Sequence, residues 1–208
     1  MDAFEAIFTR QSVGDVKPDP VPREAIEKLL SAAVQAPNHY KVRPWRFVVL
    51  TGAGRERMGE VLANSFAEKF PQAPASALDK ARSKPLRAPV IIAVGVDTPA
   101  DPKVLEIENV CAAAAACQNL LLAAHALGLA AKWRTGEEAR NPHLKEFLGF
   151  ATDQHLIALI YTGYPQGFPQ SPQDYPQGYP QGYPQSIPQA EARPVERPGF
   201  EDRTVWMG

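Results

Sequence analysis

The segment that most constrains the fold runs from Val104 to Leu127 and has Cys-Ala-Ala-Ala-Ala-Ala-Cys at its centre, residues 111–117. Alanine and leucine favour helix, and apolar side chains occur on every side of this one, so we predict a long helix buried on nearly every side. Such a helix can form the core of a monomer, or it can pack against another helix across a subunit boundary. The composition leaves both arrangements open.

The rest of the chain supplies a sheet on which that helix can pack. Residues 88–96 form a continuous apolar, β-branched run, which predicts a strand buried on both faces in the middle of a sheet. Shorter apolar runs predict strands at 47–51 and 155–162 and a short one near 129–134. With 208 residues the chain can form one domain with a real core, and one domain is the default. The first predicted helix begins at Asp2 and stops near residues 12–14. Further helices are predicted at 23–35, in the segment after Gly52 to about 70, at 75–87 and at 141–148.

A polar loop precedes the first strand. It runs from Ala36 to Trp45, and Pro37 and Pro44 each push the residue before them out of the helical region. Between these prolines lie an amide, an imidazole, a phenol and two cations, which is more polar chemistry than a simple connection needs. The loop is therefore a candidate site, although surface loops are commonly polar for no functional reason.

Several classes of site and partner find no support in the sequence. A net charge of −1 and a pI near 6.4 give no basic field for nucleic acid or an anionic membrane surface. The glycines after residue 51 mimic a dinucleotide fingerprint, but Arg57 occupies the place of its third glycine. Cys111 and Cys117 lie about 240° apart around one helix, so we expect small buried thiols, and the histidines have no metal-binding spacing. No apolar run is expected to span a membrane, and the acidic start predicts a cytoplasmic protein.

Three motifs together resemble the flavin-dependent nitroreductase family, in particular its short, compact branch. They are Thr9-Arg10-Gln11-Ser12 near the start, Asn38-His39 six residues before Pro44-Trp45, and Lys132-Trp133-Arg134-Thr135-Gly136. The resemblance covers about residues 2–163. It implies an α+β nitroreductase-like fold, a central mostly antiparallel sheet flanked by helices, and an intertwined homodimer. It also implies flavin mononucleotide (FMN) as cofactor and NADH or NADPH as electron donor.

The resemblance assigns roles to particular residues. Arg10 and Ser12 match a motif that holds the phosphate and ribityl chain of FMN. Gln11 lies between them, where the family usually has a second arginine, and is also an expected FMN contact. A basic residue that often follows is Gly14 here, so one phosphate ligand is missing or comes from elsewhere. Without the family, Arg10 and Ser12 would simply be a helix-end charge and a turn residue. The remaining expected flavin contacts are Gln35, His39, Trp133, Arg134 and Thr135.

Two of these assignments have plain alternatives. In the compact branch a basic residue is common at the position of Gln35; glutamine keeps its hydrogen bonding and loses its charge. Trp133 lies in a predicted strand, where tryptophan is most often a core residue. The family also associates the end of the long helix with the nicotinamide cofactor, which here comprises Ala123, Ala124, His125, Ala126, Leu127 and Gly128.

The composition changes sharply at Tyr164. Tyr-Pro-Gln and its variants recur at 164, 168, 171, 175, 179, 183 and 187, and proline at this density forbids helix and internal sheet. We therefore divide the chain into a nitroreductase-like flavin domain (1–163), an extended arm (164–190) and an anchor (191–208). In nitroreductases the C-terminus commonly crosses to the partner subunit and adds to its sheet, which would make the arm a tether.

The function predicted from this resemblance is an FMN-dependent oxidoreductase. NADH or NADPH would reduce the flavin, and a nitroaromatic or quinone-like small molecule would then accept the electrons, with no side chain acting as an acid. Two alternatives remain open at this point. One is a catalytically weak protein that binds or senses flavin, which the departures at Gln11, Gly14 and Gln35 suggest. The other is an interaction module that recruits partners through the proline-rich arm.

Overall fold

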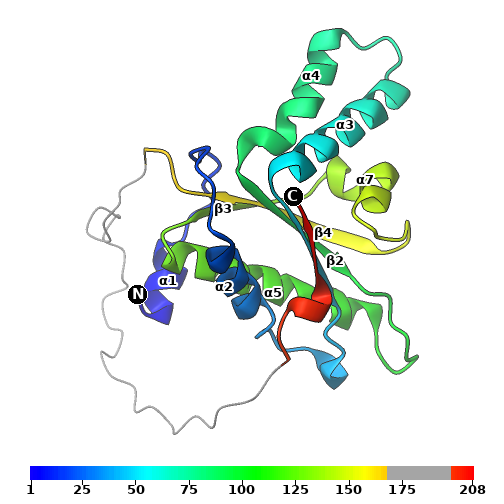
Figure 1. The fold of residues 1–208 in the computed structure, drawn as a ribbon. Helices are drawn as coiled ribbons and strands as arrows, with labels where there is room; N and C mark the ends of the chain where they lie inside the picture. The colour runs from blue at the N-terminus through cyan, green and yellow to red at the C-terminus, as the bar shows by residue number, and fades with distance from the viewer. Residues whose placement is uncertain (168–197) are drawn as a thin grey trace, which may run out of the picture.

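The structure, a computed structural model, describes residues 1–167 and 198–208, and it places a mixed five-stranded sheet at the centre of the chain (Figure 1). The strand order is β3-β4-β2-β1-β5, with β2 antiparallel to β1 and β4, β3 antiparallel to β4, and β5 parallel to β1. The prediction of an α+β fold with a mostly antiparallel sheet is therefore confirmed. The strands are β1 (Trp45–Leu50), β2 (Val90–Val96), β3 (Ala130–Arg134), β4 (His155–Gly163) and β5 (Thr204–Met207).

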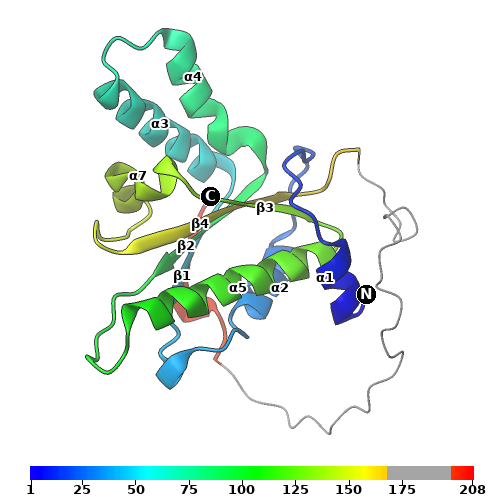
Figure 2. The same ribbon diagram turned by 180° about the vertical axis from the view of Figure 1, so that it is seen from behind.

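Helices cover both faces of this sheet (Figures 1 and 2). Because side chains alternate along a strand, Phe47 and Val49 of β1 pack with α2 and α5, whereas Val48 and Leu50 pack with α3 and α7. The helices are α1 (Ala3–Thr9), α2 (Arg23–Ala33), α3 (Gly52–Lys69), α4 (Ala75–Ser83), α5 (Glu106–Ala126), α6 (Glu137–Arg140) and α7 (Pro142–Phe147), and short 3₁₀ turns are η1 (His39–Lys41), η2 (Lys84–Arg87) and η4 (Glu201–Arg203).

The predicted central strand and the predicted start of the first helix at Asp2 are found, but this helix is shorter than expected. All seven residues of β2 are buried, and β2 is the middle strand of the five. Asp2 caps α1 by accepting a hydrogen bond from Glu5 N–H at 2.8 Å. α1 ends at Thr9, not near residues 12–14, because Arg10 is already extended and Ser12 forms a β-bridge with Ala131. Competition from the edge of the sheet thus ends the helix early.

The glycines after β1 serve packing. A Cβ on Gly54 would collide with the backbone carbonyl of Met207, and one on Gly59 would collide with that of Arg82. α3 can therefore lie close to β5 on one side and to the end of α4 on the other. The plain strand-to-helix turn predicted here, in place of a dinucleotide fingerprint, is confirmed.

α5 corrects two expectations. No apolar run was expected to span a membrane, but by length and composition alone this helix of 21 residues could do so. In the structure its inner side forms the core against the sheet. It is also not buried on nearly every side within one chain. Ile107 is 62% exposed, and Cys111, expected to be a buried thiol, is exposed while Cys117 is buried. Residues 107, 111, 114 and 118 recur at helical spacing and so share one side of α5. On this side 107, 111 and 118 are exposed and 114 is half-buried, so this chain leaves most of it uncovered.

The C-terminal segment completes the sheet. Residues 198–208 form η4 and β5, Phe200 is buried, and Arg23 of α2 stacks its guanidinium 4.3 Å from the ring centroid of Trp206. The predicted anchor therefore does add a strand, and here it adds it beside β1 of the same chain. Its first residues, 191–197, and all but 164–167 of the predicted arm lie outside the described residues.

Candidate functional site

One candidate region lies where residues 10–14 pass along the outer edge of β3. Ser12 bridges to Ala131 in parallel fashion, and Val13 N–H donates to the Ala131 carbonyl at 3.3 Å. This pairing fixes the course of the Arg10-Gln11-Ser12 motif against β3. Arg10 is half-buried, while Gln11 and Ser12 are exposed. The sequence motif near the start of the chain and the Lys132–Arg134 motif, more than 100 residues later, are thus brought together.

Gly14 leaves room for cations from β3. A Cβ at Gly14 would lie 3.3 Å from Lys132 Cδ, 3.4 Å from Lys132 Nζ and 3.8 Å from Arg134 Nη2. Two residues apart on a strand, Lys132 and Arg134 point to the same face. The missing basic residue at 14 was visible in the sequence, but Lys132 was not among the predicted site residues. The signal was present in the sequence, because Lys132 and Arg134 alternate as cations on a strand end.

Within residues 1–167 and 198–208, no acidic side chain pairs with Lys132 or Arg134. Arg134 lies over the ring of Tyr161 at 5.0 Å, and its Nε atom is buried without a hydrogen-bond partner. Burial raises the pKa of the Tyr161 hydroxyl to about 12, so this ring is a neutral neighbour that does not offset the guanidinium charge. A pair of cations with spare donors fits a phosphate group, which accepts several charge-assisted hydrogen bonds at once.

The segment assigned to the nicotinamide adjoins this region. Thr9 Oγ1 donates to the Glu5 carbonyl at 2.6 Å and lies 2.7 Å from His125 Nε2, which places the end of α5 beside Arg10. Burial, and then the charge of Arg10, lowers the pKa of His125. Of the other members of that segment, Ala124 is buried, Ala123 is half-buried, and residues 126–128 are exposed. The apolar exposed end of α5 therefore borders Arg10.

The predicted loop 36–45 forms a second, separate region. Tyr40, Lys41 and Arg43 have φ of 51°, 56° and 52°, a conformation that L residues rarely adopt and that persists only where neighbours enforce it. Asn38 Oδ1 accepts a hydrogen bond from Arg43 N–H at 2.8 Å and so closes the loop. His39 stacks on Tyr40 with the ring centroids 4.2 Å apart.

Glu108 holds His39 against α5. His39 Nδ1 lies 2.9 Å from Glu108 Oε1, while the other carboxylate oxygen accepts from Leu105 N–H at the start of the helix. The Leu105 N–H, and then His39, lower the pKa of Glu108. Because the carboxylate can only accept, Nδ1 carries a proton and Nε2 of the exposed imidazole is left for another contact.

The other predicted residues take more ordinary places. Gln35 is exposed just after α2 and donates to the Ser31 carbonyl at 3.2 Å. Trp133 is half-buried against the core, and its indole N–H donates to the Ile157 carbonyl at 2.9 Å. The alternative that Trp133 is a core residue therefore also explains the hydrogen bond of its indole nitrogen. Thr135 is exposed directly after β3.

The two regions lie at opposite ends of α5 (Figure 2). Glu108 marks one end and His125 the other, and at 1.5 Å per residue the 17 steps between them span about 25 Å. A single FMN is shorter than this. One chain therefore cannot bring His39 and the Arg10–Lys132 region to the same flavin.

A cavity of about 620 Å³ lies elsewhere, among α3, α4, α6 and α7. Its rim is formed by ion pairs such as Lys84–Glu138 (2.6 Å) and Lys69–Glu137 (3.3 Å). None of the residues that the sequence analysis assigned to flavin or nicotinamide lines it.

The comparisons with known proteins agree with the fold. The model of the nitroreductase family matches residues 7–164, and the chain belongs to that family. It is 34% identical over 167 residues to YdjA of Escherichia coli K12, which carries the name of an NAD(P)H nitroreductase, and the match covers 80% of this chain and 90% of YdjA.

Two solved structures extend this comparison. A nitroreductase-like family protein from Bacillus cereus superposes with a TM-score of 0.71 at 25% identity, covering 87% of this chain and 91% of the other. A nitroreductase from Desulfovibrio desulfuricans, solved with FMN, superposes with a TM-score of 0.61 at 28% identity, covering 79% and 87%.

Proposed function

We propose that this chain is an FMN-dependent oxidoreductase that takes hydride from NADH or NADPH and reduces nitroaromatic or quinone-like acceptors. The observation that carries the proposal is the cation pair Lys132 and Arg134, which no acid among the described residues neutralises, beside the Arg10–Gly14 segment. A relative that carries this fold was solved with FMN, and another is named for its use of NAD(P)H. Both facts support the same assignment here.

The cation pair also bears on the alternative of a weak flavin-binding protein. That alternative rested on departures from the family motif, above all on Gly14. Lys132 Nζ would lie 3.4 Å from a Cβ on Gly14, so a cation from β3 occupies the space that a longer side chain at 14 would take. The charge missing from one segment is supplied by another, and we therefore favour turnover over storage. Recruitment through the proline-rich arm concerns residues that lie almost entirely outside the described part.

We further propose that the working form is a homodimer with flavin at the subunit boundary. The uncovered side of α5 is centred near Ala114 and Gln118, midway between Glu108 and His125. A two-fold axis at that point would set two α5 helices antiparallel and bring the His39 loop of one protomer to the Arg10–Lys132 region of the other. Small side chains at 111 and 114 suit such close helix contact. This arrangement resolves the separation of about 25 Å along one α5.

Within such a site the residues of this chain bind and orient. Bound FMN supplies the hydride and electron transfer at its ring system. Lys132, Arg134 and Arg10 would offset the phosphate charge, and Ser12 would contact the ribityl chain. His39 would approach the ring from the partner side, with Nε2 free because Glu108 engages Nδ1. Residues 123–128 would border the nicotinamide, and a cytoplasmic location would suit a chain with two free cysteines.

The test is the colour of the purified protein. We expect one FMN per chain, released unchanged on denaturation and bleached anaerobically by NADH or NADPH, with a nitroaromatic or a quinone restoring the oxidised spectrum. Bound FAD, or no flavin after reconstitution with FMN, would contradict the proposal. Bleaching without reoxidation by either acceptor would instead favour a protein that stores reduced flavin.

A further inference from the structure

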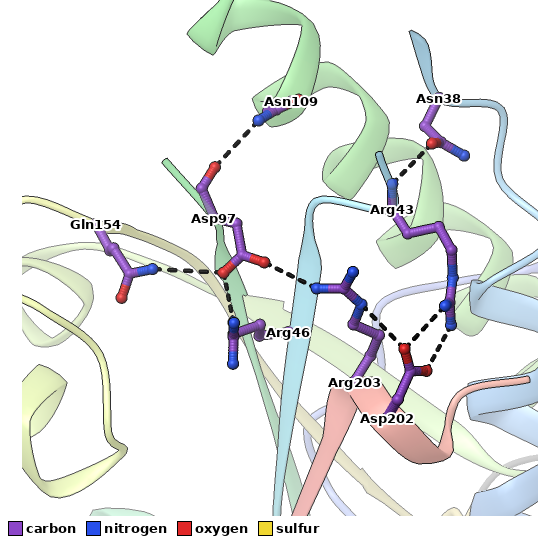
Figure 3. Close-up of polar contacts among 8 residues, drawn as sticks. All are labelled: Asn38, Arg43, Arg46, Asp97, Asn109, Gln154, Asp202 and Arg203. Atoms are coloured by element: carbon purple, nitrogen blue, oxygen red, sulfur yellow. Dashed lines mark hydrogen bonds and ion pairs between the residues drawn. The ribbon is translucent and has the colours of Figure 1, made fainter. Parts of the chain in front are cut away.

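The strained loop 38–43 is held from outside by the C-terminal segment. The Arg43 guanidinium makes a two-pronged ion pair with Asp202, Nη1 to Oδ2 at 2.9 Å and Nη2 to Oδ1 at 2.7 Å (Figure 3). Its Nη2 also donates to the Gly199 carbonyl. The Arg43 side chain is only 14% exposed, so this contact is well shielded on the loop side. A planar guanidinium paired in this way fixes orientation as well as distance.

The same segment is tied to the sheet by a second group of contacts. Arg203 Nη1 lies 3.0 Å from Asp97 Oδ2 at the end of β2, and Arg46 of β1 pairs with the other oxygen of Asp97 (Figure 3). The Asp97 backbone is in turn fixed, because its carbonyl accepts from Asn109 of α5 at 3.1 Å and its N–H donates to the Pro44 carbonyl at 2.7 Å. Asp202 therefore presents its carboxylate to Arg43 from a fixed base.

Arg43 transmits this constraint through the loop to His39. Its own N–H donates to Asn38, the residue before His39, and its φ is 52°. Without an external partner, the loop would be expected to relax toward negative φ at Arg43, and the Asn38 bond would open with it. Among the residues that the structure describes, Glu108 and stacking on Tyr40 hold the far side of His39.

We propose that the C-terminal segment is a positioning element of the flavin site, with Asp202 acting through Arg43 to hold the 38–43 loop so that His39 is presented to flavin. The inference rests on the function proposed above, and it assigns to residues 198–208 a role beyond completing the sheet. Asp202 and Arg43 are positioning residues, because neither is placed against the cofactor itself.

The experiment compares Asp202→Ala with Arg203→Ala in the full-length protein. Asp202→Ala removes the ion pair with the loop and Arg203→Ala removes the ion pair with Asp97, while both remove the longer contact of 3.5 Å between Asp202 and Arg203 Nε. Both should therefore lower the melting temperature. Asp202→Ala should raise the exchange rate of the Arg43 amide hydrogen by about tenfold and by more than Arg203→Ala does, because only Asp202→Ala removes the direct partner of the Arg43 side chain. It should also raise the dissociation constant of FMN by about 3- to 10-fold. The effect is moderate because the ion pair is partly exposed and acts on FMN only through the loop.

The second readout is the energetic coupling between Arg43 and Asp202. Arg43→Ala should match Asp202→Ala, and the double variant should be no worse than the more affected single one, because both break the same link. Arg43→Lys keeps the charge but not the paired geometry, so it should rescue only partly. Glu201→Ala, the neighbouring exposed acid, is the neutral control. If Asp202→Ala does not fold, Asp202→Asn replaces it with the same comparisons.

Three results would overturn the inference: equal exchange at Arg43 in Asp202→Ala and Arg203→Ala, no change in either, or additive effects of Arg43→Ala and Asp202→Ala. Failure of the proposed function would look different. If the protein binds no FMN, the exchange rate of the Arg43 amide in the flavin-free protein still decides whether Asp202 holds the loop.

Discussion

The two ends of α5 differ in how their charges are matched. At the end near His125, Lys132 and Arg134 have no acidic partner among residues 1–167 and 198–208. At the end near Glu108, several charged groups are paired with one another, His39 with Glu108, Arg43 with Asp202, and Arg46 and Arg203 with Asp97. Matched charges hold a backbone in place, whereas unmatched cations are available for a ligand. We infer that one end binds the phosphate and that the other is a prepared surface which needs a second protomer to become part of a site.

The strongest test of this comparison keeps the His39 end of one protomer from meeting the His125 end of another. Ala114→Glu places a charge at the middle of the uncovered side of α5, where a two-fold axis would set it against its own copy. We expect monomers by sedimentation and complete loss of FMN at micromolar protein. Gln118→Ala, a neutral change on the same side, is the matched control. A monomeric Ala114→Glu variant that retains stoichiometric FMN would show that one chain suffices.

Removing the C-terminal segment should have the next largest effect. Truncation after Ala190 deletes β5, the buried Phe200 and the Trp206 ring that contacts Arg23. Burying one such side chain contributes roughly 1.5–3 kcal/mol, so we expect a clear fall in melting temperature and weaker dimers. Replacing residues 168–190 with another proline-rich spacer of equal length should change neither quantity. Unchanged melting after truncation, with loss of a cellular partner, would favour the recruitment alternative.

The phosphate end can be tested by single substitutions. A charge-assisted phosphate contact is worth about 1.5–3 kcal/mol, so Lys132→Ala and Arg10→Ala should each weaken FMN binding by roughly tenfold or more. Lys103→Ala, which removes an exposed lysine at the opposite end of α5, is the control for net charge. Isothermal titration of the flavin-free protein with FMN measures all three. An unchanged dissociation constant for Lys132→Ala would remove the cation pair from the site.

The smallest effect concerns acid stability at the prepared end. The folded-state pKa of Glu108 is lowered, so its contribution to stability is present above the unfolded pKa, near 4.5, and is lost as pH falls through the lower folded pKa. Glu108→Gln should therefore be less stable than the parent near neutral pH, and the difference should shrink below about pH 4.5. Urea denaturation at pH 7 and at pH 3.5 measures this. A difference that stays constant with pH would mean that its charge is not involved.

Sequence patterns predicted the layers of this fold because they act locally. The all-apolar run at 88–96 predicted the central strand, found at Val90–Val96, and the amphipathic pattern of 23–35 predicted α2, where Ile26, Leu29 and Leu30 are buried. The early end of α1 was missed because it depends on a bridge between Ser12 and Ala131, residues far apart in sequence. The short helix α6 was missed because four residues carry too little periodicity to be seen.

The site was predictable as a set of motifs but not as a geometry. Arg10, Ser12 and Arg134 were named from their resemblance to a family, and the structure places them on adjoining segments. Lys132 was not named, because its relevance depends on the space that Gly14 leaves open. Asp202 was not named, because its relevance depends on a contact with Arg43, 159 positions away in the sequence. The separation of His39 from Arg10 was also invisible in the sequence, since it follows from the length and direction of α5.

The most direct test of the composite site mixes two defective chains. One carries Arg10→Ala and Lys132→Ala at the phosphate end, and the other carries Asn38→Ala and His39→Ala at the loop end. If each flavin lies between the two ends of different protomers, a mixed dimer has one doubly defective site and one intact site. Random exchange should then restore tight FMN binding and activity to about a quarter of all sites. If each site is built within one chain, mixing restores none, and that result would contradict the account.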